Sequence, residues 1–157
     1  MLKKLSLLLV VCVGIFCVTG CGEKVKNVEG TLEEIMASVY SGLADDQKPM
    51  MLVNTVVNEE NIEYYLGTSD IEYEEALASE SGVGSIAHSV VLVRVKDNAN
   101  IDSIKTKIKE NVDPRIWICV GVEEKDVIVE NKGNLIILIM VEDQTTRETL
   151  KKGFDNL

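Results

Sequence analysis

The clearest pattern in the chain is an amphipathic helix that begins near residue 32. Thr31 and Glu34 have the spacing of a capping box, in which hydroxyl and carboxylate accept bonds from free backbone N–H groups at a helix start. Apolar side chains then recur on one helical face: Leu32, Ile35, Met36, Val39, Tyr40 and Leu43. Residues 45–49 end this helix, and Asn58 begins a short second helix that stops at Gly67.

Strand patterns dominate the middle and the last third of the chain. Residues 86–95 are β-branched and nearly all apolar, which predicts a central strand. Residues 127–129 and 135–141 flank the turn Asn131-Lys132-Gly133-Asn134, which predicts a hairpin. Three weaker strand candidates are residues 50–57 (strand or buried loop), 71–79 (edge strand, with a helix as the alternative) and 116–122.

Two further helices complete the pattern. One runs from residue 101 to the Asp113-Pro114 pair, and a terminal helix starts at Asp143 or Thr145. The order helix, helix, strand, strand, helix, strands, helix predicts a single α+β domain over residues 31–157. We expect a mostly antiparallel sheet of four to five strands with helices packed on one face.

The first twenty residues follow a different pattern. Two lysines precede an uncharged and strongly apolar run, which is typical of a secretory signal. The run ends at Val18-Thr19-Gly20-Cys21, which resembles the lipobox of bacterial prolipoproteins. The resemblance implies that residues 1–20 are a signal peptide, that cleavage falls between Gly20 and Cys21, and that the Cys21 thiol carries a diacylglyceryl lipid. The alternative is an uncleaved transmembrane helix, since about 18 apolar residues span a bilayer.

A lipid on Cys21 would decide where the protein works. Two or more acyl chains hold a protein firmly to a membrane. Residues 21–30 then form a tether, and its nine residues after Cys21 reach about 30 Å when extended. We therefore expect a lipid-anchored domain on the extracytoplasmic face of the cell membrane, close to the bilayer.

Composition excludes several classes of function. Two of the 16 basic residues and none of the 26 acidic ones precede Cys21, so the net charge changes from −10 for the whole chain to −12 after cleavage. Such a polyanion is repelled by nucleic acid and by anionic headgroups, so we expect no nucleic-acid partner. The 137 residues from Cys21 onward suit one domain.

The cysteine count points away from disulfides despite the export signal. Cys12 and Cys17 would leave with the signal peptide, and Cys21 would be consumed by the lipid. Cys119 then remains alone in an apolar run, which favours an inert buried thiol over a catalytic one.

Motifs for metal, phosphate or triad chemistry are incomplete, so we expect no metal and no cofactor. His88 is the single histidine, too few for a typical zinc site, and it is interpreted as a strand-end residue without a special role. Gly82-Val83-Gly84-Ser85 precedes a strand, which indicates a hairpin bend and not a phosphate loop. Asp97-Asn98-Ala99-Asn100 lacks the glycine and distal glutamate of an EF-hand.

Acidic pairs leave one enzymatic alternative open. A glycosidase places two carboxylates across a cleft, and adjacent glutamates do not predict that arrangement. The leading hypothesis is a non-enzymatic envelope lipoprotein that binds an envelope protein or another envelope component. The alternative is a carboxylate-dependent hydrolase acting on cell-envelope material, and an importer's solute receptor ranks last because the chain is short. The pairs are Glu33-Glu34, Glu59-Glu60, Glu74-Glu75 and Glu123-Glu124.

Three segments together resemble an uncharacterised family of small lipoproteins from Gram-positive bacteria, a domain-of-unknown-function family. They are residues 61–67, 89–95 and 133–140. The resemblance implies a lipoprotein and an α+β domain. It implies no activity and no site residue other than Cys21.

Overall fold

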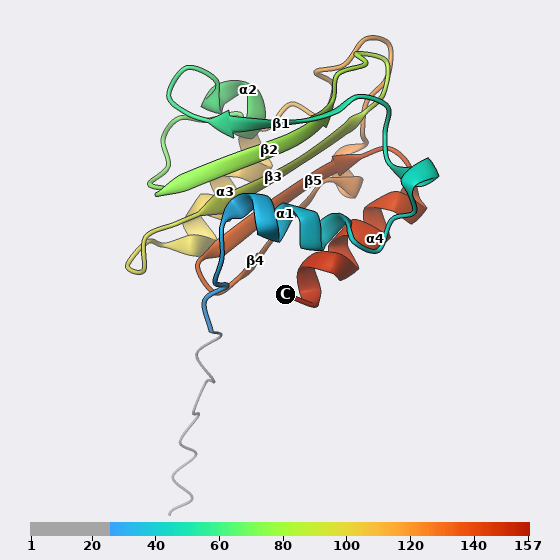
Figure 1. Cartoon of the computed structure of the whole chain (residues 1–157). Helices are drawn as coiled ribbons and strands as arrows, with labels where there is room; N and C mark the ends of the chain where they lie inside the picture. The colour runs from blue at the N-terminus through green and yellow to red at the C-terminus, as the bar shows by residue number, and fades with distance from the viewer. Residues whose placement is uncertain (1–25) are drawn as a thin grey trace, which may run out of the picture.

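The structure, a computed structural model, describes residues 26–157 and contains one five-stranded antiparallel sheet (Figure 1). The predictions for Gly20, Cys21 and the signal peptide lie outside the described residues. The sheet has the strand order β1-β2-β3-β5-β4. Its strands are β1 (Leu52–Val57), β2 (Glu75–Ser81), β3 (His88–Arg94), β4 (Ile128–Lys132) and β5 (Leu135–Val141). The helices are α1 (Leu32–Tyr40), α2 (Ile62–Leu66), α3 (Ile101–Asn111) and α4 (Gln144–Asp155), with 3₁₀ turns η1 (Asp45–Gln47) and η2 (Glu124–Asp126).

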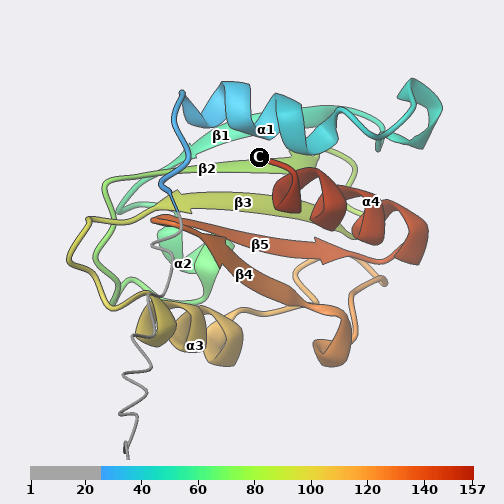
Figure 2. The same ribbon diagram turned by 90° about the horizontal axis from the view of Figure 1, so that it is seen from below.

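Helices cover both faces of the sheet, α1 and α4 on one and α2 and α3 on the other (Figure 2). Side chains of β3 alternate between the layers: Val90 and Leu92 face α1 and α4, and Val91 and Val93 face α2 and α3. The predicted α+β class and antiparallel sheet are confirmed, but the placement of all helices on one face is wrong. Since β3 and β5 are apolar on both faces, each face needs its own helical layer.

Two of the weaker strand predictions need correction. Residues 71–74 lie outside any strand, and β2 begins at Glu75 and lies between β1 and β3 instead of at the edge. The edge strand on this side of the sheet is β1, for which the sequence allowed either a strand or a buried loop. Residues 116–122 form a loop and not a strand. Their apolar side chains Trp117 and Val122 pack into the core on the sheet face that α2 and α3 cover.

Local signals explain the ends of the helices. In α1 the Glu34 N–H donates to Thr31 Oγ1 (3.3 Å) and the Thr31 N–H donates to Glu34 Oε2 (3.0 Å), which confirms the capping box. The helix α2 ends at Gly67 as predicted, in a left-handed conformation with φ 71°. It begins after Asn61, three residues beyond the predicted Asn58. The described residues include no helix long and apolar enough to cross a membrane.

Candidate functional site

Arg94, the last residue of β3, holds the chain that leads into α1. Its guanidinium donates to the carbonyl oxygens of Val28 and Gly30, each at 2.7 Å, and pairs with Glu75 through Nε at 2.7 Å. A planar guanidinium has fixed donor directions, so several bonds from one arginine set the path of the backbone it contacts. Residues 26–30, part of the predicted tether, are therefore bound to the domain; we call them the docked segment.

Asn27 fixes the other end of the docked segment. Its Oδ1 accepts from the Asn134 N–H (3.1 Å), and its Nδ2 donates to Asp97 Oδ1 (3.1 Å). The β4–β5 turn leaves room for this contact at Gly133, which has φ 56° and where a Cβ would lie 2.8 Å from the Cα of Asn27. The sequence predicted the turn, but it carried no local signal for the roles of Asn27 and Arg94.

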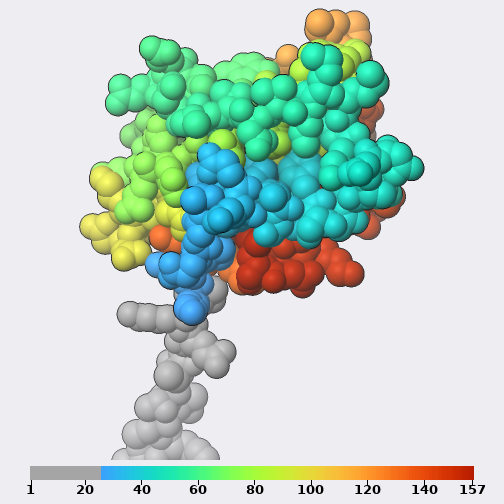
Figure 3. Space-filling view, in the orientation of Figure 1, coloured from blue at the N-terminus to red at the C-terminus, as the bar shows by residue number. Residues whose placement is uncertain are grey.

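A surface groove of about 900 Å³ lies between the docked segment, α1 and the last turns of α4. Figure 3 shows the surface of the docked segment and α1 in blue with that of α4 in red below α1. Charges of both signs line the groove, and its volume is in the range of small-molecule and peptide sites. The charged lining residues are Lys26, Glu29, Glu34, Lys132 and Lys152. This groove is the candidate binding site.

The two edges of the sheet differ in charge. The outermost strand on one side, β1, and the two residues before it carry no charged side chain over residues 50–57. Several large apolar side chains of this stretch are exposed. They are Met50 (69 %), Met51 (68 %), Val53 (48 %) and Val56 (63 %).

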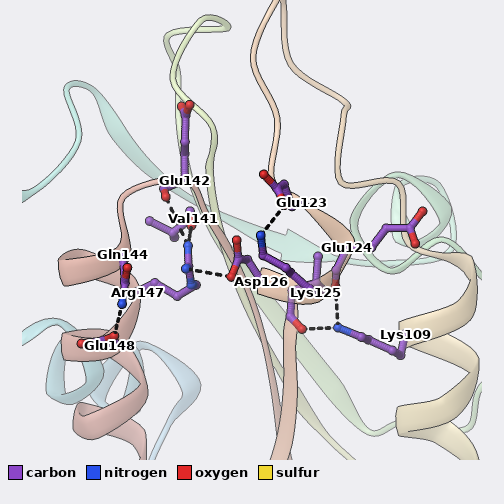
Figure 4. A network of polar contacts seen from close by, with 11 residues as sticks. Lys109, Glu123, Glu124, Lys125, Asp126, Val141, Glu142, Gln144, Arg147 and Glu148 are labelled. Atoms are coloured by element: carbon purple, nitrogen blue, oxygen red, sulfur yellow. Dashed lines mark hydrogen bonds and ion pairs between the residues drawn. The ribbon is translucent and has the colours of Figure 1, made fainter.

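The opposite edge, at β4, is bordered by ionic contacts (Figure 4). Arg147 of α4 donates to the carbonyls of Val141 (2.7 Å) and Glu142 (3.2 Å), and its Nη2 lies 3.1 Å from Asp126 Oδ1. From the other layer, Lys109 of α3 donates to carbonyls of η2 and the residue after it. The turn before β4 is thus held by both helical layers.

His88 is the first residue of β3, as the sequence predicted for a strand-end residue, and its side chain is buried and hydrogen-bonded. Its Nε2 and the Tyr40 hydroxyl share a hydrogen bond of 2.7 Å between β3 and α1. Burial lowers the pKa of His88 to about 4 and raises the pKa of Tyr40. The pair joins a helix to the sheet, and this structural contact is the role that the geometry supports.

Cys119 is exposed, so the prediction of a buried thiol is wrong. The residue has a left-handed backbone with φ 63°, in the loop that replaces the expected strand. An apolar run predicts burial on average, but a loop can turn single residues outward while Trp117 stays in the core. Among residues 26–157, no group of three His, Cys, Asp or Glu side chains is placed to hold a metal ion.

Glu80 is the described carboxyl group whose pKa is raised. Burial against α2 is the main cause, and the hydroxyls of Tyr64 and Tyr65 lie 3.4 Å from its two oxygens. The two tyrosine rings meet edge to face with centroids 4.8 Å apart. Glu80 belongs to none of the four acidic pairs, and sequence reasoning missed it because no local pattern marks a glutamate between two serines as partly buried.

No protein family, curated protein or solved structure matches this chain in the comparisons with known proteins. The resemblance to the lipoprotein family therefore stays a prediction, as does the lipobox.

Proposed function

We propose that the protein is a non-enzymatic lipoprotein, anchored to the extracytoplasmic face of the cell membrane through Cys21, that binds an envelope component. The observation that carries the proposal is the docked segment. Asn27 and Arg94 fix the chain that follows the lipobox, and Asn27 is only six residues beyond Cys21. A lipid on Cys21 would therefore hold the domain close to the bilayer, by way of the docked segment.

The groove beside the docked segment supports the binding part of the proposal. Its lysines and glutamates suit a ligand that carries both charges, such as a segment of an envelope protein. It lies next to the chain that leads to Cys21, so an anchored protein would present it toward the membrane surface.

The anchor is tested with Cys21→Ala in the full chain. Without the thiol there is no lipid attachment, so we expect an uncleaved precursor or a protein lost from the membrane fraction. Cys119→Ala, which removes the exposed thiol of the domain, is the matched control and should stay processed and membrane-bound. The measurement is fractionation with intact mass. A Cys21→Ala chain that remains processed and firmly membrane-bound contradicts the proposal.

The binding role is tested by cross-linking the anchored chain in membranes. We expect one specific partner, with capture reduced roughly tenfold by Lys152→Glu in the groove and unchanged by Lys48→Glu outside it. Absence of any specific partner together with measured turnover of envelope material would refute the non-enzymatic role.

The position of Glu80, a partly buried carboxyl group with a raised pKa beside two tyrosine hydroxyls, favours the second candidate, a carboxylate-dependent hydrolase, because catalytic carboxyl groups are often placed where burial shifts their pKa. In that case Glu80→Gln would abolish release of soluble products from cell-wall polysaccharide, and Glu130→Gln at the β4 edge would not. Equal product release from both variants, or none from the unmodified chain, rejects this candidate.

A further inference from the structure

We propose that β1 pairs antiparallel with β1 of a second copy of this chain, about a twofold axis at Asn54, to form a continuous ten-stranded sheet. The proposal is independent of the lipid on Cys21. It rests on the backbone of the edge strand, on the symmetry of its side chains and on the distribution of charge.

Alternate residues of β1 direct their backbone hydrogen-bonding groups away from β2. The Gly82 N–H donates to the Met51 carbonyl at 2.9 Å, and this pair continues the register Leu52↔Ser81. Because hydrogen-bonded and non-bonded pairs alternate in antiparallel strands, Leu52, Asn54 and Val56 direct their N–H and C=O groups away from β2. The Val56 carbonyl does point outward; it already accepts a bond from Asn61 Nδ2 (3.0 Å), and its second lone pair is the one that a partner strand would use.

Centring the axis on Asn54 makes the strand complementary to itself. Asn54 then faces its own copy in a hydrogen-bonded pair, and Val56 lies beside the second copy's Leu52 on the α1–α4 face. On the other face, Val53 lies beside the second copy's Thr55. Each of these neighbours is uncharged, and exposed apolar Val53 and Val56 both gain a partner.

Charge selects this edge for contact between two copies. The chain has a net charge of −10, so two copies repel each other over most of their surface. Residues 50–57 carry no charge, so the uncharged stretch coincides with the edge strand whose alternate backbone groups point outward. Charged side chains on an edge strand usually prevent it from pairing with a strand of another chain. The edge strand β4 carries such charges in Glu130, Lys132 and the ion pair Lys151–Glu130 (3.0 Å). In the part of the chain that the structure describes, β1 itself carries no charged side chain.

The pairing is tested by oxidative cross-linking of the full chain in which Cys119→Ser removes the exposed thiol. Paired Asn54 residues would have Cα atoms about 5.5 Å apart, within disulfide range, so Asn54→Cys should give a species of twice the mass. Val56→Cys is the matched control, because the Cα atoms of the two copies of residue 56 would lie about 14 Å apart. The parent with Cys119→Ser alone shows any cross-linking through Cys12, Cys17 or Cys21.

A second measurement uses no new thiol. Light scattering of the full chain in detergent should give a dimer, which Asn54→Lys converts to monomer by placing two like charges face to face. Asn98→Lys, the same substitution at an exposed turn, should leave the dimer intact. Equal cross-linking of Asn54→Cys and Val56→Cys, a dimer that survives Asn54→Lys, or an Asn54→Cys adduct with a protein of another mass would each overturn the proposal. The last result would show that an extended segment of a different protein occupies the edge.

Discussion

At the scale of single residues, the His88–Tyr40 pair shows how burial changes the chemistry of one side chain. His88 is 3 % exposed and sits under α1, where its Nε2 meets the Tyr40 hydroxyl. Burial penalises the charged imidazolium, so the pKa of His88 falls from its ordinary value of 6.5 to about 4. The folded protein therefore holds this histidine neutral at pH values where an unfolded chain protonates it.

The pair predicts a loss of stability in mild acid. Between pH 6.5 and about 4 the unfolded state binds the proton more tightly than the folded state, so the free energy of unfolding falls as the pH drops through this window. The shift corresponds to about 3 kcal/mol by pH 4. Urea unfolding across this range measures it.

His88→Gln is the control for this prediction, because its amide retains a partner for the Tyr40 hydroxyl but does not titrate. The variant should lose less stability on acidification than the unmodified chain. An identical decline in both proteins would assign the effect to carboxyl groups instead of His88.

At the scale of elements, local patterns predicted those parts of the fold that depend on near neighbours. The capping box at Thr31 and the turn around Gly133 place their defining residues within four positions, and both were confirmed. Residues 116–122 misled, because apolar content alone does not distinguish a strand from a loop that covers the core. The docked segment could not be predicted, since Arg94 and the carbonyl of Val28 are 66 residues apart.

We expect the substitution Arg94→Lys to release the docked segment from the domain. Lysine keeps the charge beside Glu75 but lacks the fork that reaches both Val28 and Gly30. Trypsin should then cleave after exposed Lys26 on the order of ten times faster, as one or two charge-assisted hydrogen bonds are lost. Mass spectrometry of timed digests gives the rate.

Arg115→Lys, at an exposed position, is the matched control and should leave that rate unchanged. If both variants are cut after Lys26 at the parental rate, Arg94 does not hold the docked segment.

At the scale of the whole molecule, the turn η2 joins the two helical layers outside the sheet. Lys109 of α3 bonds this turn from one layer, and Arg147 of α4 bonds it from the other. The Arg147 side chain is only 10 % exposed, so its ion pair with Asp126 and its bonds to two carbonyls are shielded from water. This contact couples the two helical layers at the β4 edge of the sheet.

Arg147→Met is expected to lower the free energy of unfolding by about 2–4 kcal/mol. The substitution leaves the Val141 and Glu142 carbonyls and Asp126 without their partner. Lys125→Met breaks the neighbouring pair with Glu123, in which both side chains are exposed, and should have no measurable effect. Urea unfolding of the parent protein and the two variants measures these free energies. Equal stability of Arg147→Met and Lys125→Met would show that Arg147 does not couple the layers.

The docked segment also orders events during biogenesis. The residues that bind the docked segment are synthesised well after it, because Arg94 follows Val28 by 66 residues and Asn134 follows Asn27 by 107. A chain emerging N-terminus first therefore exposes residues 26–30 until β3 and the β4–β5 turn have been delivered and folded. Protection of this segment from proteases thus marks the completion of folding, and a chain that stalls earlier keeps a cleavable N-terminal stretch.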